Sequence, residues 1–372
     1  MILAGTMGFL MYGMGYSIPL LKRDMEITRA LASLHQIGLA ISITVASFYA
    51  PKLLYRFSPR KIMTLGWILT SLSLLVFAFG QSLWVTVPAI CVSGMGSTLF
   101  NNVNAATLGA ASGNSMQVML RQSGIGTACG AIAPTIIGTL IGAGISWRLT
   151  LGAFAVICGL FAVKLMPSIP KRQIKRPVLG ERHWDLSLII LVVFSLSANI
   201  LEAATGSWAL DLLISRGVVV SAAVILAAFF SYGIAASRLG FSFSSKVTIK
   251  LVFASTLVLS FIGLTLIITS DSPSVTMVGL LVASLGMGPA SGLALTLCAA
   301  SSKGSDAGIA ANGMGAGFSI GIGPWIMGFV SDKSGFSTAY LFPVLMLVLM
   351  MVFFFLASSG QRKRADLTSQ RE

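Results

Sequence analysis

Glu202 stands inside a stretch of the sequence, 186–209, that is otherwise almost entirely apolar. Its neighbours at helical spacing are Ser195, Asn199 and Gly206, which share one face of a helix with it. An ionised side chain costs on the order of 2.5–3.5 kcal/mol at the centre of a membrane helix, and such groups usually face a cavity. Because burial penalises the charged form of a carboxyl group, Glu202 is predicted to take up a proton in one state and release it in another. Asn199 is predicted to bind a solute beside it.

A different role for Glu202 follows from its position along the helix. If the helix starts at Leu186 and runs outward, Glu202 lies roughly 24 Å along it, in the outer third of a membrane. From there its side chain could extend to the outer head groups and carry no proton.

A second polar cluster, FNNVNAAT (100–107), carries three amides within four residues. Asn101 and Asn104 share a helical face, with Thr98 one turn earlier. Amides both donate and accept hydrogen bonds, so this face suits a hydroxyl-rich or otherwise polar solute. Hydrogen bonding between helices, worth about 0.6 kcal/mol on average in membranes, explains the cluster equally well.

Aromatic residues supply further candidates for solute binding. Tyr12 and Tyr16 lie four residues apart near the N-terminus, and Tyr232 lies in a later apolar segment. All three are predicted to line a cavity; for Tyr12 and Tyr16, placement at the membrane surface is the alternative. Trp208 follows Glu202 by six residues. It either contributes to the same site or anchors its helix at the outer interface.

The composition identifies the medium around these residues. Of the 372 residues, 55% are hydrophobic and 10% are charged, against roughly 25% charged residues in soluble domains; the mean hydropathy is +0.90. So little charge cannot cover a water-facing surface, which predicts an integral protein of the cell membrane, inner or plasma. A membrane helix needs about 20 apolar residues. Twelve segments qualify: 3–21, 31–50, 62–80, 84–108, 118–143, 149–166, 186–209, 218–237, 247–269, 275–299, 308–331 and 338–357.

Basic residues indicate the orientation of these spans. Twelve spans place both chain ends on one side, and 19 of the 25 lysines and arginines fall on that side. Because basic loops stay in the cytoplasm, both termini are predicted to be cytoplasmic. The net charge of +14 is attributed to this topology and to contact with anionic lipid head groups, and not to nucleic acid. His35 and Gln36 then fall near the outer end of the second span, where solvation is their simplest role.

The connection 167–185 divides the chain into two parts. It is the longest connection, it is basic and Pro-rich, and it separates six spans in 1–166 from six spans in 186–357. Every other connection is too short to hold a soluble catalytic domain. The last residues, 358–372, are predicted to form a cytoplasmic tail.

The two halves also resemble each other in sequence. The triplet Gly-Met-Gly occurs at 94–96 and again at 286–288, an offset of 192, and Pro134 matches Pro324 at an offset of 190. Duplicated halves of this kind form transporters with a solute site between them, near the middle of the membrane. Because proline bends a helix, Pro134 and Pro324 are predicted to bend spans 5 and 11 and to take part in the rocking of the halves.

Together these features resemble the major facilitator superfamily over almost the whole chain. The family signature between spans 2 and 3 is Gly-x-Leu-x-Asp-Arg-x-Gly-Arg-Lys. The segment PKLLYRFSPRK (51–61) matches it at Leu53 and Arg56, and at the basic pair that begins with Arg60, one place late. Tyr55 stands where the family has Asp, so the charge-relay latch of this turn lacks its acid. SWRLTLGAF (146–154) also resembles the family.

The resemblance implies an all-α membrane protein with twelve transmembrane helices in two pseudo-symmetric six-helix bundles. Arg238, at the cytoplasmic end of span 8 within YGIAASRLG, resembles a motif residue of the family. Arg121, at the start of span 5, is assigned to a gate or to the head groups. The spacing of Glu202 and Trp208 is similar to that of a sugar-permease-like branch, in which span 7 faces the central cavity. Drug/proton antiporters carry Gly-Pro in span 5, where this chain has Ala-Pro134.

The sequence favours a transporter over an enzyme. It contains no Ser-His-Asp set, no zinc-ligand spacing and no phosphate loop with a lysine, so no cofactor or metal is predicted and the energy must come from a gradient. We expect a monomeric secondary transporter that moves a small polar organic solute, sugar-like or another metabolite, together with protons. The alternatives are an efflux antiporter for drugs or amphiphiles, a uniporter, and, from another class, a membrane sensor or lipid scramblase.

Overall fold

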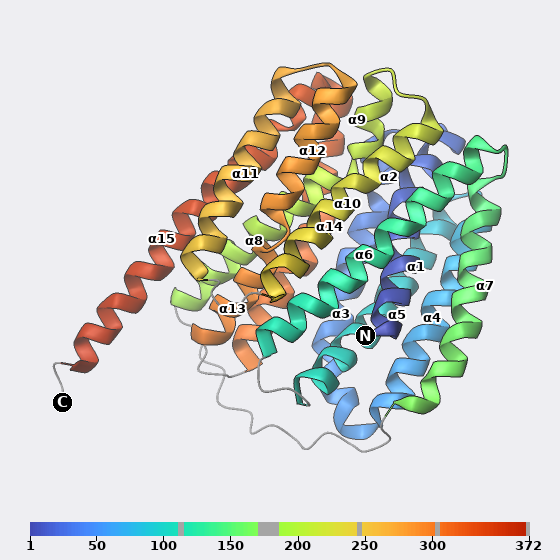
Figure 1. The fold of residues 1–372 in the computed structure, drawn as a ribbon. Helices are drawn as coiled ribbons and strands as arrows, with labels where there is room; N and C mark the ends of the chain where they lie inside the picture. The colour runs from blue at the N-terminus through green and yellow to red at the C-terminus, as the bar shows by residue number, and fades with distance from the viewer. Residues whose placement is uncertain (111–114, 170–185, 244–247, 302–305, 370–372) are drawn as a thin grey trace.

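The structure is a computed structural model, and it describes residues 1–110, 115–169, 186–243, 248–301 and 306–369. Within these ranges the chain is helical and has no strand (Figure 1). The helices in chain order are α1 (Ile2–Asp24), α2 (Arg29–Ala32), α3 (Leu34–Arg56), α4 (Pro59–Phe79), α5 (Leu83–Ala110), α6 (Ser115–Gly142), α7 (Trp147–Leu165), the 3₁₀ turn η1 (Met166–Ser168), α8 (Leu186–Ser207), α9 (Ala209–Ser215), α10 (Val220–Phe243), α11 (Ile249–Thr269), α12 (Pro273–Met287), α13 (Ala290–Ser301), α14 (Asp306–Ala339) and α15 (Leu341–Ser369).

Each of the twelve predicted spans coincides with a helix or with two successive helices. By length and hydropathy, nine helices in the described ranges could cross a membrane, and α14 and α15 together, bent by 74°, make up to ten. The first helix, α1, is rich in glycine and tyrosine and is not among the nine. The predicted linker falls largely on 170–185, outside the described residues, and the predicted tail begins inside α15.

Helix packing repeats between the two halves. Helix α6, the fifth span, packs against α1 of its own half and α10 of the other. Helix α14, the eleventh span, packs in the same way against α8 of its own half and α3 of the other. These are equivalent partners if spans 1–6 superpose on spans 7–12. The symmetry suspected from the repeated sequence is therefore present in the contacts.

Small residues make these contacts close. A Cβ atom on Gly8 of α1 would lie 2.0 Å from the carbonyl oxygen of Gly126 in α6, so no larger residue fits there. A Cβ atom on Gly315 of α14 would lie 3.0 Å from the backbone nitrogen of Leu196 in α8. Since lipid provides little hydrophobic drive between helices, such backbone contact supplies much of the packing energy. Pro134 and Pro324 lie buried inside α6 and α14 respectively, as the sequence placed them.

Spans 7 and 10 are each interrupted by a break between two helices. Span 7 breaks at Trp208 and continues as α9, so it is longer than the predicted 186–209. Span 10 breaks between Met287 and Ala290, where Pro289 cannot continue the hydrogen-bond ladder. Helices α2 and α9 lie at the same end of the bundle, uppermost in Figure 1. We call this the α9 end.

Candidate functional site

A cavity of about 220 Å³ lies between the two halves. Helices α1 and α3 line it from the N-terminal half, and α8 and α10 line it from the C-terminal half. Its lining residues are Met11, Tyr12, Gly15, Tyr16, Gln36, Glu202, Ala203, Gly206, Ser207, Phe230, Ser231 and Ile234. Apart from Glu202 these side chains are uncharged at neutral pH, so Glu202 is the charged group of the cavity lining.

Glu202 lies level with the middle of the bundle. It shares the cavity with Tyr12 in the middle of α1 and with Ser231 in the middle of α10. The sequence estimate placed it in the outer third of the membrane, and the difference arises because span 7 continues beyond Ser207 as α9. A carboxyl group at this depth faces the cavity between the halves and not the head groups.

Arg238 forms an ion pair with Glu202. Its Nη2 atom lies 2.6 Å from Glu202 Oε2, and the two side chains are 8% and 20% exposed. The sequence had placed Arg238 at the cytoplasmic end of span 8, away from the acid. Two features bring it within reach. Helical side chains lean toward the N-terminus of their helix, which places the guanidinium about one turn closer to the middle of the bundle. Glu202 also lies closer to the middle of the bundle than expected.

The guanidinium of Arg238 also connects several helices. Its Nε donates to the carbonyl oxygen of Gly288 at 2.8 Å, in the interruption of span 10, where the helix leaves a carbonyl available. Its Nη2 donates to Ser291 Oγ at 3.1 Å, and its Nη1 donates to Thr127 Oγ1 at 3.0 Å. Thr127 belongs to α6, so the ion pair is held jointly by both halves. Sequence reasoning missed Thr127, Gly288 and Ser291; the helix-breaking Gly-Pro at 288–289 was the available signal.

The predicted tyrosines divide into two groups. Tyr12 and Tyr16 line the cavity. The Tyr12 hydroxyl donates to Thr127 Oγ1 at 3.2 Å, and the Tyr16 hydroxyl donates to the Ala227 carbonyl oxygen at 2.9 Å. Tyr232 does not line the cavity; its hydroxyl lies 3.2 Å from Thr135 Oγ1 of α6.

The predicted asparagines lie outside the cavity lining. Asn199 donates to the carbonyl oxygen of Ser195 at 2.7 Å, one turn earlier on its own helix. Asn101 is exposed, whereas Asn104 is buried and its Nδ2 has no hydrogen-bond partner in the described part of the chain. Helical spacing predicted a shared face for Asn101 and Asn104, but in the structure one side chain is exposed and the other is buried.

Gln36, expected to be solvated, lines the cavity instead. Its side chain is 7% exposed, and its Oε1 atom has no hydrogen-bond partner within the described residues. The preceding residue, His35, is also buried: its Nε2 lies 2.8 Å from Thr86 Oγ1 and its Nδ1 lies 2.9 Å from the Ala32 carbonyl oxygen. Both expectations of simple solvation were wrong: His35 packs against Thr86 of α5 and Phe77 of α4, and Gln36 faces the cavity.

Trp208 is fully buried, so it is not an interfacial anchor. Its Nε1 donates to the carbonyl oxygen of Pro324 at 2.8 Å, and it does not line the cavity. The bond joins the interruption of span 7 to the proline of span 11, where the missing N–H of proline disturbs the helical ladder. The structure therefore gives Trp208 and Pro324 a shared packing role within the C-terminal half.

Replacing Trp208 by phenylalanine is expected to lower the free energy of unfolding by about 1 kcal/mol, because the buried Pro324 carbonyl loses its shorter hydrogen bond and keeps the one from Ser33 Oγ at 3.4 Å, while most of the packing is kept. The neighbouring Trp325 is 42% exposed and stacks on Phe329, so Trp325→Phe is a matched control with a smaller expected effect. Thermal unfolding of the purified variants measures both. Equal melting temperatures for the two variants would contradict the assigned role.

Three of the predicted gate and motif arginines, Arg56, Arg60 and Arg121, lie at the opposite end from α9. Arg60, at the start of α4, donates through Nη2 to the carbonyl oxygen of Ile169 at 2.7 Å and also to that of Pro167. It thus joins α4 to the end of α7 within one half. Arg56 is exposed at the end of α3. Arg121 lies over the ring of Phe243, 4.9 Å from its centroid, which connects α6 with α10.

Four charged residues join the two halves at the α9 end. Asp211 of α9 is 3% exposed and pairs with Lys22 of α1 and with Arg29 of α2, whose Nε lies 3.1 Å away. Arg29 also pairs with Asp332 of α14 at 2.9 Å. We call these residues the α9-end ion cluster. The sequence counted Lys22 and Arg29 only as loop charges, so this contact was not predicted.

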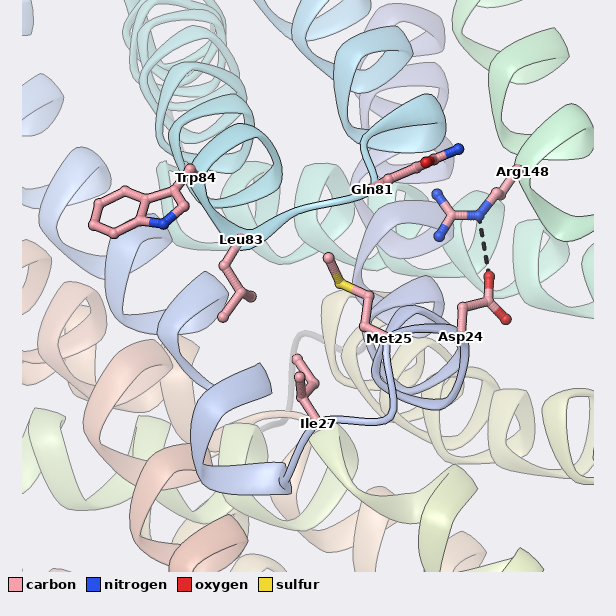
Figure 2. A pocket seen from close by; sticks show the side chains of 7 residues that line it. All are labelled: Asp24, Met25, Ile27, Gln81, Leu83, Trp84 and Arg148. Carbon is pink, nitrogen blue, oxygen red and sulfur yellow. Dashed lines mark hydrogen bonds and ion pairs between the residues drawn. The ribbon is translucent and has the colours of Figure 1, made fainter.

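A larger hollow of about 650 Å³ lies at the same end but within the N-terminal half (Figure 2). Arg148, from the motif SWRLTLGAF, pairs there with Asp24 at 3.0 Å and donates to the carbonyl oxygens of Ala78 and Gly80 at the end of α4. Trp84, across the hollow, is 90% exposed. None of the predicted solute-binding residues lines this hollow. The cavity between the halves is therefore the candidate site.

Comparison with known proteins agrees with this architecture. The family model of the Major Facilitator Superfamily matches residues 1–311. A mutant of the nucleoside transporter NupG has a similar structure, with a TM-score of 0.70 at 13% identity over 96% of this chain and 98% of that one. The human organic anion transporter MFSD10 (TETRAN) is similar at a TM-score of 0.67 and 14% identity over 93% and 98% of the two chains. No curated protein matches the sequence significantly.

The match covers most of the chain and includes the elements that build the cavity, and the solved transporters share the fold from end to end. The predicted architecture of two six-helix bundles is confirmed, and the chain belongs to the Major Facilitator Superfamily of membrane transporters.

Proposed function

We propose that this protein is a secondary transporter that carries a small polar organic solute across the membrane by alternating access, coupled to protons through Glu202. The observation that carries this proposal is the Glu202–Arg238 ion pair at the cavity between the halves. A buried acid that can exchange its proton beside a solute site is the minimal device for proton coupling. Because Arg238 also donates to Thr127 of the other half, breaking or forming the ion pair would alter a contact between the two bundles.

The size of the cavity favours a small solute. Its volume of about 220 Å³ lies below the roughly 300–1,000 Å³ of sites for drug-sized molecules. This observation disfavours the alternative, an efflux antiporter for amphiphiles. The two similar structures are of a nucleoside transporter and an organic anion transporter, so the fold is compatible with polar solutes of either kind.

We further propose that the α9 end faces the outside and that both termini are cytoplasmic. The basic connections support this orientation, since basic loops stay in the cytoplasm. The α9-end ion cluster then closes the outer entrance by joining α1 and α2 to α9 and α14. Transport requires this cluster to separate and the opposite end to close, with the halves rocking about α6 and α14.

The proton role is tested by Glu202→Gln, which keeps the shape of the side chain but cannot ionise. Solutes are first identified by a thermal-shift screen of sugars, nucleosides and organic acids. In proteoliposomes, the variant is expected to lose accumulation driven by a pH gradient while it keeps exchange of labelled for unlabelled solute. Glu26→Gln, at an exposed glutamate of the α9 end, is the matched control and is expected to keep both. If Glu202→Gln retains accumulation driven by the pH gradient, the proton role is wrong.

A further inference from the structure

Arg238 fixes a permanent positive charge beside the cavity. A guanidinium group does not lose its proton in proteins, and a buried cation without an anion is strongly unfavourable. In the described residues at this cavity, the charged or titratable side chains are Glu202, Arg238, Tyr12 and Tyr16. His35 lies on another face of α3, against Thr86. At neutral pH, Glu202 is thus the anion that compensates Arg238.

Protonation of Glu202 removes this compensation. If Glu202 carries the coupling proton, the loaded state contains a neutral acid and a cation with no partner. A neutral solute such as a sugar would leave that cation uncompensated, which is strongly unfavourable at a buried site. A carboxylate would restore the balance, and guanidinium groups bind carboxylates in a well-matched, often bidentate geometry. The proton and an anionic solute therefore favour each other's binding.

We propose that the transported solute is a small hydroxylated carboxylate, which replaces Glu202 on the guanidinium of Arg238 while Glu202 takes up a proton. This inference rests on the proposed function and specifies its solute. The site is neutral in both states: Glu202 and Arg238 cancel when it is empty, and the solute anion and Arg238 cancel when it is loaded. One proton and one monocarboxylate therefore cross together without net charge.

Gln36 supports the hydroxyl group of the proposed solute. Its side chain lines the cavity, is 7% exposed and has an unpaired Oε1 atom. A buried amide atom without a partner carries an unfavourable free energy that a ligand can relieve. A hydroxyl group both donates and accepts, so it satisfies this amide whichever way the amide is oriented. The cavity of about 220 Å³ has room for a hydroxylated carboxylate of the size of lactate or glycerate.

The proton linkage can be measured directly on the purified full-length protein. The probes are lactate and glycerate; lactamide lacks the charge and propionate lacks the hydroxyl group. Isothermal titration calorimetry in buffers of different ionisation enthalpy is expected to show uptake of about one proton per anion bound. The apparent dissociation constant is expected to rise about tenfold for each pH unit while Glu202 is ionised in the empty protein. Lactamide is expected not to bind.

Variants separate the two parts of the inference. Glu202→Gln is expected to bind lactate with no proton uptake and no dependence on pH, because Arg238 is then permanently available. Gln36→Leu is expected to weaken lactate binding while leaving propionate binding unchanged. In proteoliposomes, lactate uptake driven by a pH gradient is expected to be insensitive to a potassium diffusion potential. Binding of lactate without proton uptake by the unmodified protein would overturn the inference, as would failure of all the anionic probes to bind.

The outcomes distinguish this inference from the proposed function. If a sugar or nucleoside accumulates with a pH gradient and depends on Glu202 while no carboxylate binds, the transporter proposal stands and the anionic solute is wrong. If carboxylates bind with proton uptake but do not cross the membrane, the site chemistry stands and the transporter proposal is wrong.

Discussion

Replacing Arg238 by glutamine is expected to destabilise the protein by about 3–5 kcal/mol, the usual cost of removing one partner from a buried ion pair. The reason is that Glu202, only 20% exposed, would lose the cation that lies 2.6 Å away and would have to remain charged without a partner or take up a proton. The Gly288 carbonyl oxygen would also lose the donor that satisfies it in the interruption of span 10. Thermal unfolding followed by tryptophan fluorescence measures the effect.

A second substitution tests whether the unpaired charge is the cause. The double variant Arg238→Gln with Glu202→Gln has no buried charge at this position, so most of the lost stability is expected to return. Arg23→Gln, at an exposed arginine of α1, is the control and is expected to change stability by less than about 0.5 kcal/mol. If the loss of stability in the double variant equals the sum of the losses in the two single variants, the ion pair does not carry the energy assigned to it.

The architecture was predictable because a membrane span is a local property of the sequence. Twenty apolar residues in a row predict a membrane helix whatever surrounds them, and Pro134 and Pro324 are visible as equivalent positions without any structure. The halves then follow from the repeat and the central connection. The candidate acid, Glu202, was also predictable, because a carboxyl group within an apolar span is energetically costly and usually faces a cavity where it has a function.

The partners of Glu202 were not predictable in the same way. Pairing with Arg238 depends on the relative depth of two helices, and depth depends on where each helix begins and ends. Span 7 continues past Trp208 as α9, and this shift moves Glu202 from the outer third to the middle of the bundle. Helical periodicity likewise predicted a shared face for Asn101 and Asn104, but it could not predict that Gln36 lines the cavity and that these asparagines do not.

The charges at the α9 end were hidden from sequence for a related reason. Lys22 and Arg29 lie in a short connection and look like solvated loop residues, while Asp211 lies beyond the predicted end of span 7. In the structure Asp211 is 3% exposed and accepts from both cations. Loop charges are informative about orientation in the membrane, but their partners emerge only when the two halves are brought together.

Replacing Asp211 by asparagine is therefore expected to weaken the closure of the α9 end by about 3 kcal/mol, because Lys22 and Arg29 lose a buried anion. Such a change shifts the ratio of closed to open molecules by about a hundredfold. Spin labels at Glu26→Cys and Ser272→Cys, both exposed and in opposite halves, report the distance across this end in a background without the four native cysteines. The distance distribution is expected to move to longer values in Asp211→Asn.

The control for this experiment lies in the same cluster. Asp332 and its partner Arg29 are 24% and 23% exposed, so Asp332→Asn removes a more solvated pair that is worth at most about 1 kcal/mol. It is expected to broaden the distance distribution only slightly. If Asp332→Asn opens the α9 end as much as Asp211→Asn does, burial of Asp211 is not what holds the halves together. If neither variant changes the distance, the packing of α3 against α14 closes this end without the charges.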